Sequence, residues 1–421
     1  MRIETKCLHE GYEPKNGEPR VMPICQSTTF TYDSTEKIGD LFDLTSNGFF
    51  YSRLANPTVD WVEKKIAALE GGVGALCTSS GQAASTLAIL NILNAGDSFI
   101  ATSTIYGGTI NLFAVTFKRF GIECIFVDSD ASEEEIQAKI KPNTKAVFGE
   151  TIANPAITVF DIEKFSKIAQ KNNIPLIVDN TFATPILCRP FEFGADIVIH
   201  STSKYMDGHA VQIGGVIVDS GNFNWSNGKF PEFTEPDESY HGIVYTEHFG
   251  KAAFIAKARV QLMRDIGATP SPLSAFLLNL GLETLHIRMK AHCENAQKVV
   301  EYINKSDKVK YVNYPTLEGN KYYTLAKKYL PNGCSGVISF AISGGKQSAI
   351  KFMDSLKLAS NVVHVADIRT CVLHPASATH RQLTDEQLIA AGIDGGMIRL
   401  SVGLENIEDI IEDLQQAFDK I

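Results

Sequence analysis

The chain has 421 residues, of which 44% are hydrophobic and 21% charged, and its formal net charge is −9. This length exceeds what one ordinary hydrophobic core supports, so we expect a globular protein of two domains. The sequence has no basic stripe, no apolar run long enough to cross a bilayer, no apolar leader and no CxxC pair among its eight cysteines. These features predict a cytoplasmic protein with free thiols and no nucleic-acid or membrane partner.

The first part of the chain predicts an arm followed by a sheet. Residues 1–57 show little periodicity and carry turn and aromatic residues, which indicates an N-terminal arm lying on another surface. A helix follows, with Asn56 as N-cap and Pro57 at its first position, and it ends before Gly71. Strand and helix patterns then alternate, which is typical of a mainly parallel sheet in a large domain at 58–262. The expected strands are 75–78, 98–102, 123–127, 146–150, 176–179, 196–201 and 215–218, with helices near 82–94, 108–120, 132–140 and 161–171.

The remainder predicts a smaller α/β domain at 263–421. A polar, turn-rich insertion covers residues 221–250, and a long helical stretch is expected from 273 to about 302. The last helix has one apolar face and Asn406 as its N-cap. The other expected elements are strands at 308–313, 336–342 and 397–402, and helices near 320–329, 345–356, 384–391 and 406–419.

The strand at 196–201 runs into Ser201-Thr202-Ser203-Lys204. A lysine just past a buried strand lies at the carboxyl edge of a parallel sheet, where open α/β folds bind their ligands. Burial lowers the pKa of a lysine amine and turns it into a nucleophile for carbonyl groups. Taken alone, a lysine in this position is more often a solvated loop residue.

Other strand ends carry polar residues of matching chemistry. The turn Thr78-Ser79-Ser80-Gly81 opens a helix, whose free N–H groups suit a phosphate. Asp179 needs a cationic partner such as a pyridinium nitrogen if it is buried. Tyr106 could stack on a planar ring, and Asn154 could bond a ring oxygen. The alternative for the turn is a plain strand-to-helix connection, and that for Asp179 is a turn cap or a structural ion pair. Tyr106 could instead be a core tyrosine, and Asn154 part of an ordinary Asn-Pro turn.

Arg399 is a charge inside an apolar strand, where it would hold a carboxylate or an internal salt bridge. His374 and His380 are as consistent with a structural role as with a catalytic one, and no histidine has metal-ligand spacing. Together, the strand ends would supply a phosphate cradle, a stacking ring, an acid and a lysine. Those are the needs of pyridoxal 5′-phosphate (PLP).

In this order the motifs resemble the Cys/Met-metabolism family of PLP-dependent enzymes over nearly the whole length. The resemblance implies the fold type I (aspartate aminotransferase-like) architecture, with a mainly parallel seven-stranded sheet and a smaller C-terminal α/β domain. It also implies a dimer with shared active sites, usually assembled into a tetramer. The motifs are Tyr51-Ser52-Arg53, Asn56-Pro57-Thr58, Ser79-Ser80-Gly81, Tyr106-Gly107-Gly108-Thr109, Glu150 to Asn154, Val178-Asp179-Asn180, Ser201 to Lys204, His374-Pro375-Ala376-Ser377 and Arg399-Leu400-Ser401-Val402-Gly403.

The resemblance also implies a role for each site residue. Lys204 would bind the cofactor aldehyde and move protons, with Tyr106 stacking on the ring and taking part in catalysis. Asp179 would keep the ring nitrogen protonated, while Arg399 would clamp the substrate carboxylate and Asn154 would contact the cofactor or the substrate. The implied phosphate ligands are Gly81, Gln82, Ser201 and Ser203, the two serines lying on one side of an extended segment, with Tyr51 and Arg53 reaching in from the neighbouring subunit.

The activity that the resemblance implies is γ-replacement, in which O-acetyl-L-homoserine and sulfide give L-homocysteine and acetate, as in methionine biosynthesis. The alternatives are methionine γ-lyase activity and the cystathionine γ-synthase or O-succinylhomoserine type. Gly108 stands where γ-lyases carry a cysteine, and the insertion at 230–241 is similar to the sulfhydrylase pattern. His364-Val365-Ala366-Asp367 departs from the Asn-Val-Gly-Asp of sulfhydrylases, so we expect His364 to affect substrate preference.

Overall fold

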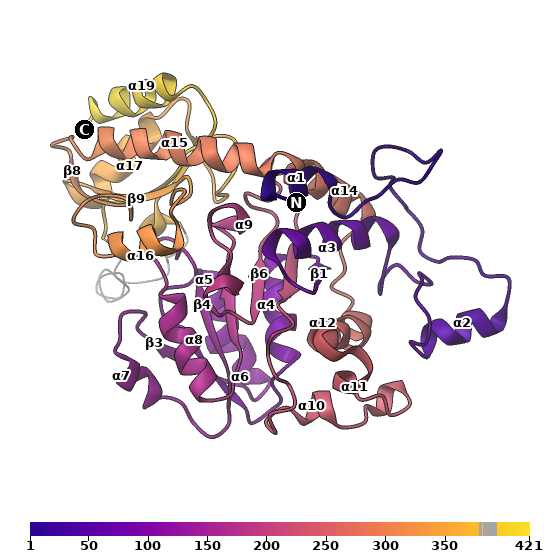
Figure 1. The fold of residues 1–421 in the computed structure, drawn as a ribbon. Coiled ribbons are helices and arrows are strands. Elements are labelled where there is room, and N and C mark those ends of the chain that lie inside the picture. Colours follow the sequence, from indigo (N-terminus) through magenta and orange to yellow (C-terminus); the bar gives the residue numbers. More distant parts are fainter. Residues whose placement is uncertain (379–380, 382–393) are drawn as a thin grey trace.

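The structure is a computed structural model that describes residues 1–378, 381 and 394–421. Two sheets, each surrounded by helices, make up the body of the molecule, and the N-terminal arm extends from one side (Figure 1). The expected helix near 384–391 and His380 lie outside the described residues. No helix in the described part is long and apolar enough to cross a membrane.

The larger sheet has seven strands in the order β1-β7-β6-β5-β4-β2-β3. Every strand runs parallel to the others except β7, which pairs antiparallel with both β1 and β6. The expectation of a mainly parallel seven-stranded sheet is therefore confirmed. The strands are β1 (Gly74–Thr78), β2 (Ser98–Thr102), β3 (Glu123–Val127), β4 (Thr144–Glu150), β5 (Leu176–Asp179), β6 (Ile197–His200) and β7 (Gly215–Asp219).

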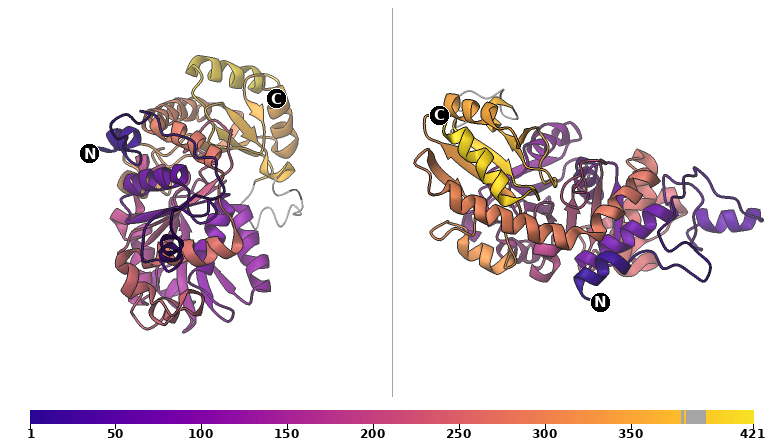
Figure 2. Two further views of the ribbon diagram at one scale, coloured as in Figure 1. Left: turned by 90° about the vertical axis from the view of Figure 1, so that its right-hand side faces the viewer. Right: turned by 90° about the horizontal axis from the view of Figure 1, so that it is seen from above.

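Helices pack around this sheet (Figures 1 and 2). Asn56 caps the first of them by accepting the N–H of Thr58, and Asp161 caps another by accepting the N–H of Lys164, both as expected. The helices are α3 (Pro57–Glu70), α4 (Gly81–Leu90), α5 (Gly107–Asn111), α6 (Phe117–Arg119), α7 (Glu133–Gln137), α8 (Ile162–Lys171), α9 (Thr184–Leu187), α10 (Pro231–Thr234), α11 (Tyr245–Phe249), α12 (Ala253–Lys257) and α13 (Arg264–Ile266).

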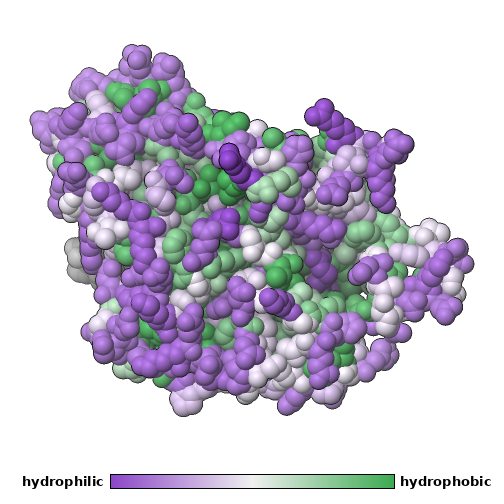
Figure 3. Space-filling model, in the orientation of Figure 1, coloured by the Kyte–Doolittle hydropathy of each residue, from purple (hydrophilic) through white to green (hydrophobic). Residues whose placement is uncertain are grey.

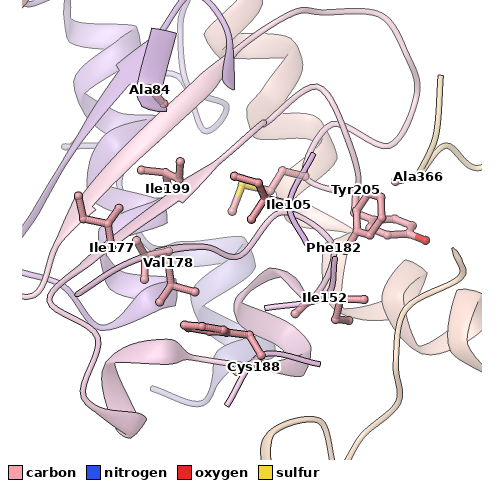
Figure 4. Packing of buried hydrophobic residues seen from close by; sticks show 14 of the residues in the cluster. Ala84, Ile105, Ile152, Ile177, Val178, Phe182, Cys188, Ile199, Tyr205 and Ala366 are labelled. Carbon is pink, nitrogen blue, oxygen red and sulfur yellow. The ribbon is translucent and has the colours of Figure 1, made fainter. Parts of the chain in front are cut away.

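The sheet is buried on both faces, so its strands read as continuous apolar runs without alternation. All five residues of β2 and of β7 are buried. Figure 4 shows the packing around Ile177, Val178 and Ile199 at the centre of the sheet. Burying one such side chain contributes about 1.5–3 kcal/mol to the stability of the fold. The strand ends are therefore held by a well-packed core.

The second sheet has five strands in the order β10-β11-β12-β9-β8, which fits the expected smaller α/β domain. Two of its strands were not predicted, because runs of two and three residues are too short to show a period. Asn406 caps the last helix as expected. The elements are β8 (Val309–Asn313), β9 (Val337–Ile342), β10 (Ser360–Asn361), β11 (Cys371–Leu373), β12 (Met397–Ser401), α16 (Tyr323–Tyr329), α17 (Gly345–Ser355) and α19 (Ile407–Phe418).

The expected helical stretch from 273 to about 302 consists of two helices. The structure has α14 (Pro272–Glu283) and α15 (Leu285–Ile303), which are separated at Thr284. The Arg288 guanidinium donates to the Gly281 carbonyl at 2.6 Å, and a Cβ on Gly281 would lie 2.4 Å from the Met206 carbonyl oxygen. Glycine at this position therefore lets α14 approach the backbone that follows Lys204.

The N-terminal arm is more ordered than its lack of periodicity suggested. It contains α1 (Ile3–His9) and α2 (Thr35–Phe42), each about two turns long and shorter than the window over which a helical period is usually read from sequence. Helix α2 lies beyond the body in two perpendicular views (Figures 1 and 2). The domain boundaries at 57/58 and 262/263 remain predictions; the second of them falls inside the helical stretch 253–266.

Candidate active site

A cavity of about 690 Å³ lies at the carboxyl edge of the large sheet. Because β1, β2, β4, β5 and β6 are parallel, the residues that follow them meet at this edge. All of the predicted site residues line the cavity except Tyr51 and Arg53. Those that line it are Gly81, Gln82, Tyr106, Asn154, Asp179, Ser201, Ser203, Lys204 and Arg399.

One end of the cavity is formed by the N-terminus of α4. Ser80 caps this helix by accepting the N–H of Ala83 at 3.1 Å. A Cβ on Gly81 would lie 2.6 Å from the Cβ of Ser201, so glycine allows the helix to meet the end of β6 directly. The unpaired N–H groups and the positive end of the helix dipole at this point suit an anion.

The turn after β6 differs from the expected extended segment. The strand ends at His200, and residues 202–207 form turns, with the N–H of Lys204 donating to the Ser201 carbonyl at 3.2 Å. The Ser203 hydroxyl accepts the N–H of Gly214 at 2.9 Å and lies 3.3 Å from the Gly214 carbonyl oxygen. To reach a phosphate oxygen, this hydroxyl hydrogen would have to leave the Gly214 carbonyl.

Asp179 ends β5 and is held on one side only. Its Oδ1 accepts the backbone N–H of Thr181 at 3.0 Å and the Thr181 hydroxyl at 2.5 Å. Burial raises the pKa of Asp179, while the two bonds from Thr181 act in the opposite direction. A cation against this carboxylate, such as a protonated ring nitrogen, would keep it ionised.

Lys204 follows β6 at the same edge of the large sheet as Asp179, and its side chain reaches the segment between β10 and β11 of the second sheet. Burial, and secondly the charge of Arg399, lower the pKa of its amine to about 8. Its Nζ lies 3.4 Å from Nδ1 of His364. A lysine with a lowered pKa has an available lone pair near neutral pH, as a nucleophile or a base requires.

Arg399 projects from β12 of the second sheet and is buried. It donates to the side-chain oxygen of Asn154 at 3.2 Å and to the carbonyls of Val363 and His364 at 2.9 Å and 3.2 Å. Burial lowers its pKa, and no carboxylate of the described residues pairs with it. A substrate carboxylate would match this guanidinium.

Tyr106 is positioned by a residue that we did not single out from the sequence. Glu150, at the end of β4, accepts the backbone N–H of Tyr106 at 2.8 Å. Burial and the neighbouring charge of Asp179 raise the pKa of Glu150 well above its usual range. Its position at the end of a predicted parallel strand was the one feature of the sequence that could have indicated this role for Glu150. A Cβ on Gly108 would lie 2.5 Å from the Tyr106 ring and 2.7 Å from Gln82 Nε2.

A buried polar layer lies beneath these residues. Oε1 of Glu70, the last residue of α3, lies 2.6 Å from His200 Nε2 and accepts the side-chain N–H of Asn180 at 3.1 Å. The Thr151 hydroxyl donates to the other end of the Asn180 amide at 2.8 Å. These bonds connect the ends of β4, β5 and β6 to one another. The backbone that carries the cavity-facing side chains is therefore held in place.

Tyr51 and Arg53 lie elsewhere in the chain. They border a second cavity of about 440 Å³ between the arm and the insertion, which Tyr240 and His241 also line. Arg53 donates to the carbonyl of Arg264, and its guanidinium carbon lies 5.0 Å from the Tyr51 ring centroid. One copy of the chain therefore does not bring these two residues to the larger cavity.

The cavity residues fit the groups of a phosphorylated pyridoxal. The N-terminus of α4 could hold the phosphate, Asp179 the ring nitrogen, and Lys204 the aldehyde. The buried Oε1 of Gln82 has no hydrogen-bond partner within the described part of the structure, so no donor of the chain fixes this amide. Its NH₂ group, not this oxygen, could donate to a phosphate.

Comparison with known proteins gives results that agree with this geometry. The family model described as "Cys/Met metabolism PLP-dependent enzyme" matches residues 4–419. An O-acetyl-L-homoserine sulfhydrylase from Leptospira meyeri is 46% identical, covering 100% of this chain and 97% of its own. A homocysteine/cysteine synthase from Saccharomyces cerevisiae is 44% identical, covering 100% and 98%.

A solved structure gives the same result. The crystal structure of a putative O-acetylhomoserine (thiol)-lyase from Campylobacter jejuni superposes with a TM-score of 0.96 at 38% identity, and the match covers 100% of both chains. That protein carries an N′-pyridoxyl-lysine-5′-monophosphate residue.

Proposed function

Because the chain belongs to the Cys/Met metabolism family of PLP-dependent enzymes, we propose that it converts O-acetyl-L-homoserine and sulfide to L-homocysteine and acetate. The observation that carries this proposal is the position of Lys204, Asp179 and Arg399 around one cavity. The names of full-length relatives, O-acetyl-L-homoserine sulfhydrylase and homocysteine synthase, give the substrate and the product. The reaction would belong to methionine biosynthesis.

In this proposal the large sheet holds the cofactor. The N-terminus of α4, with Gly81, Gln82 and Ser201, binds the phosphate, and Ser203 joins them once its hydroxyl turns. Asp179 pairs with the ring nitrogen, Lys204 binds the aldehyde, and Tyr106 stacks on the ring. When bound, the cofactor supplies an electron sink for the negative charge that forms when an amino acid loses its α-proton.

The substrate is held and deprotonated by residues from both sheets. Arg399 binds the α-carboxylate, with Asn154 fixing the guanidinium from its other side. The Lys204 amine would remove the α-proton, give it up to the bound cofactor and then remove a β-proton; acetate would leave from Cγ, and hydrosulfide would add at that carbon. Both protons would then return to carbon through the Lys204 ammonium, one to Cβ and one to Cα, so the lysine ends the cycle unprotonated.

The described lining favours an acetyl over a succinyl leaving group. A succinyl group carries a second carboxylate, which would need a cationic partner in a partly buried site. Lys204 and Arg399 are the cationic side chains among the described residues that line the cavity, and both have other roles in the proposal. We therefore expect O-succinylhomoserine to be a much poorer substrate.

Two features favour γ-replacement over the alternative activity, methionine γ-lyase. Gly108 has no room for a side chain unless Tyr106 or Gln82 moves, so the cysteine of the γ-lyases would change the wall of the cavity. The insertion, which is similar to the sulfhydrylase pattern, borders the same small cavity as Tyr51 and Arg53. It would therefore lie beside the part of the arm that reaches a neighbouring active site.

We also propose a homo-oligomer with shared active sites, assembled as a tetramer and located in the cytoplasm. Tyr51 and Arg53 would enter the cavity of a second copy and contact the phosphate. Exposed apolar side chains on α1, α14 and α15 support an interface on that side, and hydrophobic residues gather across this face (Figure 3). They are Leu8, Leu273, Leu280 and Ile287, each more than two fifths exposed.

Product analysis tests the proposed activity. The purified holoenzyme is incubated with O-acetylhomoserine with and without sulfide, and with O-succinylhomoserine or methionine in parallel. Homocysteine and acetate should form in equal amounts, and homocysteine only when sulfide is present. Rapid release of 2-oxobutyrate from methionine, with little homocysteine from the acetyl ester, would replace the proposal by a γ-lyase.

A further inference from the structure

His364 is the described side chain that accepts a hydrogen bond from Lys204. It lies in the segment between β10 and β11 and lines the large cavity. Its Nδ1 is 3.4 Å from the Lys204 amine. No step of the reaction proposed above uses this contact, although the amine is its central group.

Contacts of the backbone hold the segment around His364 in place and do not involve the imidazole. The His364 carbonyl accepts a hydrogen bond from Arg399 at 3.2 Å and lies 3.5 Å from the Cys371 thiol. Ala366 has a left-handed backbone, with φ of +64°, and its N–H donates to the Ser401 hydroxyl at 2.8 Å. Replacing the imidazole would therefore leave the course of this segment intact.

The charge state of His364 makes it an acceptor. Burial, and secondly the charge of Lys204, lower the pKa of its imidazole to about 4; Asp367 acts in the opposite direction, and Arg399 and Arg369 lower the pKa by smaller amounts. Near neutral pH the ring is uncharged, and its Nδ1 can accept from the Lys204 ammonium only if Nε2 carries the hydrogen.

A hydrogen on Nε2 destabilises the folded chain, because it is a buried donor without an acceptor among the described residues. Within the described part of the structure, this buried atom has no hydrogen-bond partner. A buried polar group of this kind destabilises the folded state, so its persistence needs a reason. The contact that the other ring nitrogen makes with Lys204 provides one.

We propose that His364 is a positioning residue, whose neutral Nδ1 accepts a hydrogen bond from the ammonium of Lys204 whenever that lysine is not bonded to the cofactor. In the reaction, the amine takes the substrate α-proton and becomes an ammonium, and one of its N–H groups donates to Nδ1. The proton remains on the lysine until the amine gives it up in the next proton transfer. This inference rests on the proposed role of Lys204 as the base.

The contact has a measurable consequence for the lysine. An acceptor that faces an ammonium favours the charged form and raises the pKa of the amine. Losing a hydrogen bond to a charged group should therefore lower that pKa by about one pH unit. Only the unprotonated amine attacks an aldehyde, so the rate of cofactor uptake by the cofactor-free chain reports this pKa.

The test compares three substitutions at this position. His364→Asn keeps an amide oxygen close to the place of Nδ1, His364→Gln carries its amide out to the place of Nε2, and His364→Phe keeps only the ring. The growth of visible absorbance after mixing the full cofactor-free chain with PLP is recorded against pH. Separately, kcat and KM of each holoenzyme are measured with O-acetylhomoserine and sulfide.

We expect the uptake midpoint to lie near pH 8 in the natural chain and in His364→Asn. It should fall by about one pH unit in His364→Phe and His364→Gln, together with a lower kcat and a nearly unchanged KM. Equal midpoints in all four proteins, or a Gln variant that behaves like the Asn variant, would overturn the inference. Failure of the natural holoenzyme to form homocysteine would refute the proposed function while leaving the uptake result valid.

Discussion

Thr181 holds two of the cavity residues in place. Its hydroxyl donates to Asp179 and accepts the backbone N–H of Ser201 at 2.9 Å, so one side chain links the ends of β5 and β6. Two bonds on one carboxylate oxygen fix the rotation of Asp179 and leave the other oxygen for the cofactor. The ionised form of this carboxylate depends on a cation beside it, because burial alone raises its pKa.

Asp179→Asn should therefore lower kcat by on the order of 10²–10³-fold while PLP still binds, because the neutral amide no longer stabilises a protonated ring nitrogen. Thr181→Val is the matched control, since it removes the hydroxyl and leaves the carboxylate. It should cost about tenfold, because the hydroxyl's two hydrogen bonds, to Asp179 and from Ser201, are lost while the charge of Asp179 remains. Steady-state kinetics on both PLP-loaded variants measures the difference, and a larger loss in Thr181→Val would contradict this order.

Lys204 makes the cofactor-free chain less stable at neutral pH. Its pKa is about 8 in the folded chain and 10.5 as the ordinary value, so the unfolded chain binds more protons between these two pH values. Stability therefore rises with pH across this window, and below about pH 8 the full cost of burying the ammonium is present.

We expect Lys204→Met to stabilise the cofactor-free chain by on the order of 2 kcal/mol at pH 7.5, and by clearly less at pH 9.5. Denaturant unfolding at the two pH values measures this. The exposed Lys64→Met is the control and should change stability little at either pH. A stabilisation that is the same at both pH values would show that the effect comes from packing and not from the charge.

At the scale of elements, α4 and β6 meet without a side chain between them. A Cβ on Gly81 would lie 2.6 Å from Ser201 Cβ and 2.9 Å from its Cα, so one of the two elements must shift. The helix terminus and the strand end both border the proposed phosphate site. A shift of either one changes the distance between phosphate ligands on different elements.

Gly81→Ala should weaken PLP binding at least about tenfold, because a displaced helix terminus loses part of its contact with the phosphate. Gly39→Ala in α2 is the matched control, since a Cβ there meets nothing within 4 Å. That change should leave PLP affinity unaltered and add about 0.5–1 kcal/mol to helix stability. Titration of each cofactor-free variant with PLP gives both affinities, and equal values would refute the role of this close approach.

Most elements of the sheet could be predicted because their signals are local. Strands such as β5 and β6 are short apolar runs, and caps such as Asn56 and Asp161 act on the next turn of the same helix. The interruption at Thr284 could not be predicted, because it depends on contacts with the turn after Lys204, far away in sequence.

The same limit applies to the site. Lys204, Asp179 and Tyr106 could be found because each follows a predicted strand of one parallel sheet. The contact between His364 and Lys204 joins residues 160 positions apart from two different sheets, and no pattern in either segment indicates it. Glu150 was overlooked for a related reason: its partner is a backbone N–H on another strand's loop.

At the scale of the whole molecule, the proposed second copy would account for the position of Tyr51 and Arg53. Both residues lie on the arm, away from the cavity of their own chain. Arg53→Ala and Lys204→Ala should each be inactive. In the proposed dimer, each active site takes Lys204 from one chain and Arg53 from the other. Mixing the two variants under conditions of subunit exchange should then restore about a quarter of the activity, because half of the dimers have one intact site. No recovery, despite exchange shown by mass spectrometry, would place Arg53 in its own chain's site.

We propose that Lys204 binds the cofactor because it lies at the carboxyl edge of the sheet. Lys257 provides an internal comparison, since burial also lowers its pKa to about 8 but it lies away from the cavity and bonds to Asn91. The holoenzyme is reduced with borohydride and digested, and the peptides are analysed by mass spectrometry. We predict a phosphopyridoxyl group on the peptide that contains Lys204, and loss of the visible absorbance in Lys204→Ala. A modified Lys257 peptide with an unmodified Lys204 peptide would contradict the account.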